Sequence, residues 1–287
     1  MPEMPEVQGL TRFLAERAVG RTITRATVAA ISALKTYDPP IHALQGAEIT
    51  AASRHGKFVV LTCRDDLHLA FHLAKAGWLR WYDTLPTTLI KPGKSPIALR
   101  IALDDGSGFD LTEAGTKKSL AVYVVRDPQD VPGIARLGPD PLDPSFTREV
   151  FAGLLAGKRM QIKGLLRDQA VIAGIGNAYS DEILHAARMS PYAISAKLDD
   201  DEIDRLFAAT HATLTDAVTA ASGKPPADLK DAKRRGMQVH ARRGEACPVC
   251  GDIVRSVFFA DRSMEYCPTC QTGGKPLADR RLSRLLK

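Results

Sequence analysis

Four cysteines in the last fifth of the chain restrict its fold more than any other feature. They form two pairs, Cys247-x2-Cys250 and Cys267-x2-Cys270, with sixteen residues between the pairs. Two such knuckles can bring four thiolates around one tetrahedral zinc ion. All four positions are then filled by the protein, so the expected Zn²⁺ is structural and takes no part in catalysis.

The alternative pairing of these cysteines is two disulfides, which persist in oxidising compartments. The N-terminus shows no basic region followed by an apolar run, so no secretory signal is expected. No stretch approaches the roughly 18 apolar residues of a membrane span. We therefore expect a cytoplasmic protein without membrane contact, and zinc in preference to disulfides. The fifth cysteine, Cys63 in VVLTC, is expected to be a small buried hydrophobe.

Hydrophobic periodicity changes from strand-like to helical after about residue 145 of the 287, which predicts an α+β protein. Residues 5–19 have the pattern of an amphipathic helix, and residues 22–125 hold short Val-, Ile- and Thr-rich runs typical of a sandwich or barrel. We expect an N-terminal β domain over 1–130, a Pro- and Asp-rich linker over 131–145, and a helical domain over 146–235. The zinc finger and a basic tail then occupy 236–287. Within the finger, IVRSVFFADRSMEY predicts two strands and a turn near Asp261-Arg262.

The opening heptad, MPEMPEV, has two interpretations. If Met1 is removed, Pro2 becomes a free secondary amine beside Glu3, which suits nucleophilic catalysis. The simpler interpretation is a helix start, with Pro5 at the first helical position and Glu6 in the first turn. That interpretation accounts for Pro5 and Glu6 and leaves Pro2-Glu3 without a role.

Two further features are compatible with phosphate binding and with plain structural roles. In Ala-Gly-Ile-Gly-Asn, between helices predicted over 163–172 and 177–189, Gly176 and its neighbours suit a tight turn, and Asn177 can cap the next helix. Backbone amides there, with Lys163, could hold an anion. Arg262 could likewise contact a phosphate or simply occupy a hairpin turn. The net charge of +6 favours a polyanionic partner but is a weak signal alone.

The order of these motifs resembles the formamidopyrimidine-DNA glycosylase / endonuclease VIII family. The similarity covers about residues 2 to 271, and the motifs that carry it are MPEMPEV, SRHGKF (53–58), LGPDPL (137–142), IK with LRDQ (162–169), AGIGNAY (173–179), and the four-cysteine finger with Arg262 five residues before Cys267. The resemblance implies a β-sandwich, a helix–two-turn–helix domain and a zinc finger. It also implies a monomer that binds damaged double-stranded DNA.

The resemblance further implies a base-excision-repair glycosylase with AP lyase activity. Pro2 would attack C1′ of a flipped, oxidised nucleotide and form a Schiff base, after which β- and δ-elimination cut the strand. Glu3 resembles the acid that protonates the sugar ring oxygen, and Glu6 a supporting carboxylate. Lys57 resembles a loop lysine on the phosphate near the lesion. Asn177 and Arg262 resemble two further phosphate contacts.

The sequence departs from the family pattern where side chains fill the gap left by a flipped base. The expected Met of the first loop is replaced by Lys75, and the second loop carries Lys117 and Lys118 without an aromatic residue. The stretch SGKPPADLKDAKRRG (222–236), where a lesion-capping loop is expected, is short and charged. We therefore expect a divergent branch of the family with altered lesion choice. In this branch the lysine side chains would contact DNA where stacking side chains are expected, and the protein would also accept single-stranded or gapped DNA.

Two other functions remain compatible with these residues. A non-catalytic module could bind damaged DNA or abasic sites through the same fold. A zinc-ribbon RNA-binding protein would also be basic. Neither requires a free N-terminal proline, so the state of Met1 distinguishes them from the enzyme.

Overall fold

A computed structural model describes residues 1–91, 93, 95–259 and 263–278. It contains two compact units, each completed by a second stretch of chain. Unit 1 comprises Met1–Leu137 with Ala221–Ala232, and unit 2 comprises Gly138–Ala220 with the chain from Lys233 onward. No described helix combines the length and the apolar character needed to cross a membrane.

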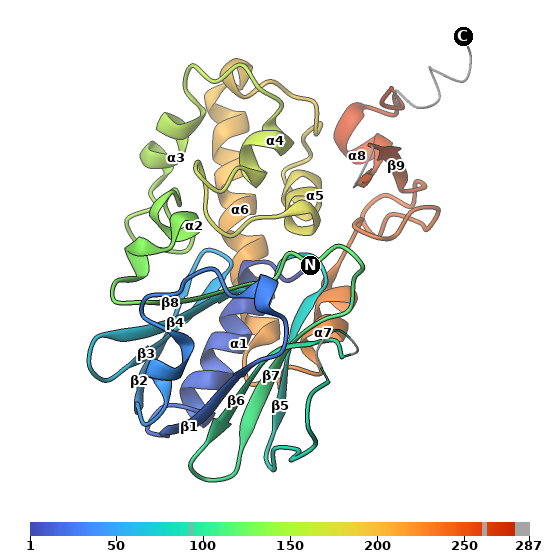
Figure 1. Cartoon of the computed structure of the whole chain (residues 1–287). Helices are drawn as coiled ribbons and strands as arrows, with labels where there is room; N and C mark the ends of the chain where they lie inside the picture. Colours follow the sequence, from blue (N-terminus) through green and yellow to red (C-terminus); the bar gives the residue numbers. More distant parts are fainter. Residues whose placement is uncertain (92, 94, 260–262, 279–287) are drawn as a thin grey trace. The chain divides into compact units, whose positions relative to one another are not determined.

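Unit 1 is a two-sheet β structure with one long helix (Figure 1). One sheet has the order β1-β6-β7-β5 and the other β2-β3-β4-β8, and every pair in both is antiparallel. Its main elements are α1 (Met4–Arg17), β1 (Ile23–Val28), β2 (Ile49–His55), β3 (Phe58–Cys63), β4 (Leu67–His72), β5 (Gly77–Tyr82), β6 (Ile97–Leu103), β7 (Gly108–Glu113), β8 (Ala121–Val125) and α2 (Pro132–Ala135). The sandwich expected from the alternating strands is confirmed.

One hydrophobic core joins both sheets to α1. Val7, Leu10 and Leu14 of the helix are buried in the same cluster as Leu61 of β3 and Leu111 of β7. The i, i+3, i+7 spacing on the helix and the alternate positions on the strands point these side chains inward. Because α1 is buried along this face, its N-terminus is fixed relative to the sheets.

A later stretch of chain completes unit 1. Trp78 Nε1 donates to the carbonyl of Pro226 at 3.0 Å, and the ammonium of Lys230 lies 4.4 Å from the centre of the Trp78 ring. Leu229 packs so closely on Gly9 of α1 that a Cβ on Gly9 would stand 3.0 Å from Leu229 Cδ2. Residues 221–232 therefore form part of the packing of α1.

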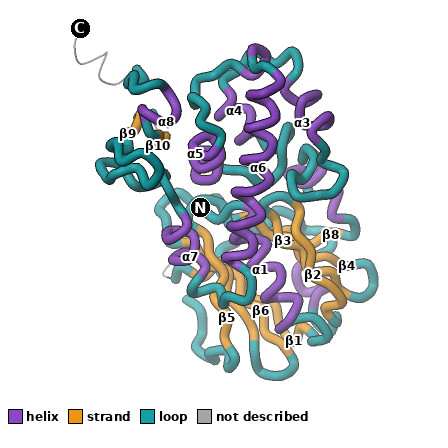
Figure 2. Tube along the Cα trace, turned by 180° about the vertical axis from the view of Figure 1, so that it is seen from behind, coloured by secondary structure: helices purple, strands orange, loops and turns teal. Residues whose placement is uncertain are grey.

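Unit 2 contains a helical subdomain and the cysteine finger. Its elements are α3 (Arg148–Leu155), α4 (Ile162–Arg167), α5 (Asn177–Ala186), α6 (Asp200–Ala221), β9 (Arg255–Phe258), β10 (Ser263–Tyr266) and α8 (Pro268–Thr272), while α7 (Leu229–Gly236) contributes its last residues. Figure 2 shows α3, α4 and α5 beside the long α6, and the short strands β9 and β10 next to α8. The helical subdomain and the antiparallel finger hairpin were both expected from the sequence.

Two helices differ from the sequence-based expectation. The helix predicted over 163–172 ends at Arg167, because the residues that follow form a turn organised by Gln169. The stretch 222–236, where the resemblance places a lesion-capping loop, contains α7. Leu229, its one large apolar residue, is buried and explains why so polar a stretch is helical there.

Candidate active site and zinc centre

The N-terminus of α1 holds two buried acids next to Pro2. Glu3 and Glu6 are each only 2% exposed, and Pro2 is buried as well. Glu3 is the N-cap of the helix, and its backbone N–H donates to Glu6 Oε2 at 2.8 Å in a reciprocal capping box. The helix begins at Met4, one residue before the predicted start. The helix-start interpretation is thus correct for Glu6, and it also gives Glu3 a backbone role.

Lys57 lies in the turn between β2 and β3, in the same unit. Gly56 has a φ of +55°, a left-handed conformation that favours glycine at this position. Arg54 fixes the turn, since it donates to the carbonyl of Gly56 at 3.2 Å and to Gln8 Oε1 of α1 at 2.7 Å. Lys57 itself is buried. Burial, followed by the positive charge of Lys57, lowers the pKa of neighbouring His72 to about 4, so this imidazole is neutral at pH 7.

The two loops that lack the expected aromatic and Met residues lie next to each other. Gly77 pairs with Glu113 at the ends of β5 and β7, and the N–H of Ala114 reaches the carbonyl of Ala76 at 3.4 Å. Lys75 on the first loop is exposed, as are Lys117 and Lys118 on the second. Three lysines are thus presented by adjoining loops.

In unit 2, Gln169 holds the glycine turn. Its side-chain nitrogen donates to the carbonyl of Ile175 at 2.7 Å, and its oxygen accepts from the N–H of Gly174 at 3.0 Å. Gly174 has a φ of +87°, as the tight turn predicts, whereas Gly176 has an extended backbone with a φ of −125°. Only the first glycine is therefore needed for its backbone conformation.

Asn177 does not cap α5, contrary to the sequence-based expectation. Gly176 is the N-cap without a side-chain bond, and Asn177 is the first helical residue. Its Nδ2 instead donates to the carbonyl of Ser263 on β10 at 2.8 Å. The side chain thus links the glycine turn to the finger hairpin, which sequence reasoning missed.

Lys163 is buried and its ammonium is engaged within unit 2. It donates to Asp181 Oδ1 at 2.6 Å, to Ser180 Oγ at 2.7 Å and to the carbonyl of Asn177 at 3.1 Å. An ammonium has three protons, so these three acceptors match its donor capacity. Direct phosphate binding by Lys163 stays a prediction, and the observed contacts hold the start of α5.

A second basic group meets the same aspartate. His240 Nδ1 lies 2.7 Å from Asp181 Oδ2 and 3.0 Å from Glu265 Oε2 on β10. Glu182 next to Asp181 accepts three backbone N–H groups, those of Gln238, Val239 and His240. No sequence motif pointed to these contacts, because their residues lie up to 84 positions apart and only folding brings them together.

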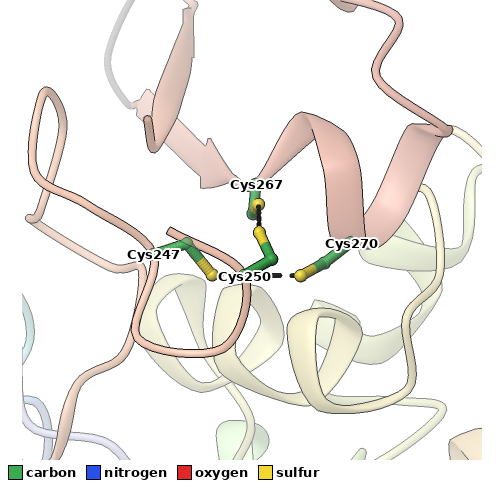
Figure 3. A group of neighbouring side chains, drawn as sticks. All are labelled: Cys247, Cys250, Cys267 and Cys270. Atoms are coloured by element: carbon green, nitrogen blue, oxygen red, sulfur yellow. Dashed lines mark hydrogen bonds between the residues drawn. The ribbon is translucent and has the colours of Figure 1, made fainter. Parts of the chain in front are cut away.

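The four predicted cysteine ligands form one cluster. Their Sγ atoms all lie within 4.8 Å of one another, with 3.4 Å between those of Cys250 and Cys267 and 3.9 Å between those of Cys247 and Cys270 (Figure 3). Four sulfurs at about 2.3 Å from a tetrahedral zinc stand about 3.8 Å apart, so the cluster fits one structural Zn²⁺. None of the five cysteines forms a disulfide in this structure. His185 Nε2 of α5 lies 3.3 Å from Cys247 Sγ and so connects the metal site to the helical subdomain.

The predicted phosphate contact Arg262 lies outside the described residues. The ten-residue α5 nevertheless explains why Asn177, Asp181 and His185 all contact the finger segment. These residues are four apart and therefore share one side of the helix. That periodicity is the one signal in the sequence that could have revealed the side of α5 that contacts the finger.

Comparisons with known proteins agree with this architecture. Residues 1–118 match the family model of the formamidopyrimidine-DNA glycosylase N-terminal domain, residues 137–225 match the H2TH domain of the same glycosylase, and residues 244–273 match a zinc finger found in FPG and IleRS. A formamidopyrimidine-DNA glycosylase from Symbiobacterium thermophilum is 34% identical over 281 residues, covering 94% of this chain and 89% of its own.

Two further relatives extend the comparison. An uncharacterized formamidopyrimidine-DNA glycosylase-like protein of Mycobacterium tuberculosis is 59% identical over 151 residues, which are 53% of this chain and 94% of that protein. The solved complex of Lactococcus lactis Fpg with abasic-site DNA superposes with a TM-score of 0.83 at 26% identity, covering 94% of this chain and 99% of that one. Domain content, full-length sequence similarity and fold agree, and the chain belongs to the formamidopyrimidine-DNA glycosylase family.

Proposed function

We propose that this protein is a DNA glycosylase with AP lyase activity that uses the amine of Pro2 as its nucleophile. The observation that carries the proposal is the pair of buried acids beside Pro2. Burying a carboxylate costs free energy unless it is compensated, and a single exposed Ser or Asp would cap α1 equally well. Buried acids next to a potential amine nucleophile are instead typical of a catalytic site.

The proposed reaction starts once Met1 has been removed. The Pro2 nitrogen attacks C1′ of the damaged nucleotide, the C1′–N glycosidic bond breaks, and the free base leaves with a proton. Glu3 protonates the sugar ring oxygen, so that the ring opens and the amine is left as an iminium ion. The iminium acidifies the C2′ proton, and its removal expels the 3′ phosphate. A second elimination expels the 5′ phosphate.

The other predicted residues would bind and orient the DNA. Lys57, Asn177, Gly176 and Arg262 are proposed as phosphate contacts, a role compatible with the polyanion preference expected of a positively charged protein. Capping of α1 by Glu6 supports a role in holding Glu3 and Pro2 in place. A Zn²⁺ ion held by Cys247, Cys250, Cys267 and Cys270 would stabilise the finger, and with four protein ligands it would have no open position for catalysis.

The chemistry is tested by trapping with borohydride, which reduces an imine to a stable amine. The protein is incubated with duplex DNA carrying one abasic site, and covalent adducts are separated by denaturing electrophoresis. We expect an adduct with the unaltered protein, none with Pro2→Gly or with an extra residue before Pro2, and an adduct with the matched control Pro5→Ala. Binding of the DNA without any adduct would contradict the proposal.

A non-catalytic damage-binding protein is the second candidate. The observation in its favour is that the exposed lysines of the adjoining loops and the cysteine cluster could serve DNA binding without any chemistry at Pro2. Mass spectrometry of the N-terminus separates the two candidates. A retained Met1 would block the amine and favour binding without chemistry.

We propose that the three exposed lysines on the adjoining loops alter lesion choice. Lys75, Lys117 and Lys118 offer charge where stacking would fill the gap left by a flipped base, so activity should tolerate gapped or single-stranded DNA. Oxidised purines, oxidised pyrimidines and abasic sites, each in duplex and single strand, form the test panel. A strong preference for 8-oxoguanine opposite cytosine in duplex DNA would contradict this specificity.

A further inference from the structure

The zinc-finger segment, which begins at residue 236, contacts one side of α5 at three levels along the helix. Asn177 reaches the carbonyl of Ser263 on β10, Asp181 contacts His240, and His185 contacts Cys247. The first contact is an amide–carbonyl bond, and the third involves a zinc ligand. The middle contact differs from both, because it is made of charged groups in a buried position.

At this middle level, His240 connects two elements through one ring nitrogen. Nδ1 stands at hydrogen-bond distance from Asp181 Oδ2 on α5 and from Glu265 Oε2 on β10. Both carboxylates are buried, the side chain of Asp181 completely. Replacing His240 by a residue without an imidazole would therefore leave the two buried carboxylates of Asp181 and Glu265 facing each other between α5 and the hairpin.

The charges around His240 balance only if the imidazole is protonated. Burial raises the pKa of Asp181, but the Lys163 ammonium at Asp181 Oδ1 and the imidazole at Oδ2 oppose this and favour the charged carboxylate. Asp181 and Glu265 then bring two negative charges, and Lys163 on α4 supplies one positive charge. Glu182 is occupied by the backbone N–H groups of residues 238–240. Burial opposes the charged imidazole, but the hydrogen bonds and negative charges of Asp181 and Glu265 outweigh burial and raise the pKa of His240 to about 9.

A metal ion bound by Asp181, His240 and Glu265 is the competing explanation, since their ligand atoms lie within 4.8 Å of one another. The 2.7 Å between His240 Nδ1 and Asp181 Oδ2 is a direct hydrogen-bond distance, shorter than the roughly 3 Å between two ligands of one ion. The Lys163 ammonium also already occupies the other oxygen of Asp181. A proton shared by the imidazole and the acids fits these distances better.

We propose that protonated His240 is a positioning residue that locks the β9–β10 hairpin to α5, and that DNA affinity depends on this lock. The inference rests on the proposed DNA-binding function, because both joined elements carry predicted phosphate contacts. The lock acts on binding and leaves the chemistry at Pro2 unchanged. It also makes DNA affinity sensitive to alkaline pH, at which the imidazole loses its proton and one acid loses its counter-charge.

The test measures binding of a duplex with a tetrahydrofuran abasic analogue, which forms no imine, by fluorescence anisotropy at pH 7 and pH 9.5. We expect His240→Gln to weaken binding about tenfold at pH 7, a loss typical of one charge-assisted contact. The wild-type protein should approach the variant's affinity at pH 9.5. His240→Arg, which keeps its charge at both pH values, should bind equally well at both. The exposed His211→Gln is the matched control and should behave like wild type at both pH values.

Four outcomes decide between the explanations. Equal affinities of wild type and folded His240→Gln at both pH values would overturn the proposal. If His240→Gln does not fold, the comparison is between the wild-type protein and His240→Arg. A loss of DNA affinity from pH 7 to pH 9.5 in the wild-type protein but not in His240→Arg would support the proposal. Equal losses of affinity in both proteins would overturn it. If the wild-type protein binds a second equivalent of zinc and His240→Arg does not, Asp181, His240 and Glu265 form a metal site, and the proposed lock is overturned. With saturating abasic-site DNA, the yield of the borohydride-trapped adduct should differ less than twofold between His240→Gln and the wild-type protein. Because this yield reports the Pro2 chemistry and the anisotropy reports binding, a failure of the lock is distinguishable from a failure of the Pro2 chemistry.

Discussion

At the scale of single residues, the buried Lys163–Asp181 pair separates a positioning role from direct DNA contact. Lys163→Met leaves Asp181 without its ammonium partner and should lower the free energy of unfolding by about 3 kcal/mol, as for other broken buried pairs. DNA affinity should fall with it. In the double variant Lys163→Met/Asp181→Asn, stability should largely return, because no buried charge is left unpaired. DNA affinity should match that of Asp181→Asn alone, because both proteins lose the charged contact between Asp181 and His240.

Chemical denaturation and anisotropy on the four proteins of this double-mutant cycle make the measurement. If the double variant binds DNA more weakly than Asp181→Asn alone, Lys163 contacts phosphate directly. The prediction made from the sequence for this residue would then be correct.

His240 should also give unit 2 a pH-dependent stability. Its pKa is raised on folding, so the stabilisation is fully present below pH 6.5 and is lost as the pH rises through about 9. The difference in Tm between wild type and His240→Gln should therefore shrink steadily between pH 7 and pH 9.5. Differential scanning fluorimetry measures it, and a Tm difference independent of pH would exclude a charged imidazole.

At the scale of elements, the chain at Gly138 and Pro139 packs closely on the glycine turn of unit 2. Gly138 donates its N–H to the carbonyl of Gln169, and a Cβ on Gly138 would stand 2.5 Å from the backbone of Val171. Gly138→Ala must displace backbone and should destabilise unit 2 by about 1–3 kcal/mol.

The control for that substitution is Gly153→Ala on α3, where a Cβ meets nothing within 4 Å. Alanine has the higher helix propensity, so this variant should be neutral or up to about 1 kcal/mol more stable. Urea denaturation compares both variants with the wild-type protein. Equal stabilities for the two would show that the turn adjusts to Gly138→Ala without cost.

At the scale of the whole molecule, zinc removal should act on the two units differently. The finger depends on its metal, whereas the core of unit 1 consists of two sheets and α1. Chelation should release one zinc per chain, unfold the finger and abolish DNA binding, while the cooperative unfolding of unit 1 persists. Cys267→Ser should reproduce this effect, and Cys63→Ala, which alters a cysteine outside the cluster, should retain zinc.

Metal analysis, circular dichroism and DNA binding before and after chelation provide the measurement. Complete loss of structure on zinc removal would mean that the two units do not fold separately. Retention of full DNA affinity by the zinc-free protein would remove the finger from the proposed DNA-binding role.

Local patterns in the sequence predict the antiparallel sandwich, the helical subdomain and the cysteine cluster. These features depend on short-range patterns: alternation with a period of two, apolar spacing with a period near 3.6, and ligands two residues apart within each knuckle. The same local signals suggested α1 and the turn at Gly174. They could not reveal α7, whose helix depends on burying Leu229, nor the early end of α4, which Gln169 sets through contacts across the turn.

Tertiary structure alone decided what surrounds each charged group. Asn177 was expected to cap its own helix, and its side chain instead forms a hydrogen bond with β10. Lys163 was expected to contact a DNA phosphate, and its ammonium is bound to Asp181 inside unit 2. The cluster of Lys163, Asp181, His240 and Glu265 joins residues far apart in sequence, and no local pattern predicts which acid a given cation will meet. Periodicity determines which side of an element is buried, whereas the partner of a buried charge depends on how the elements pack, and that pairing sets its pKa.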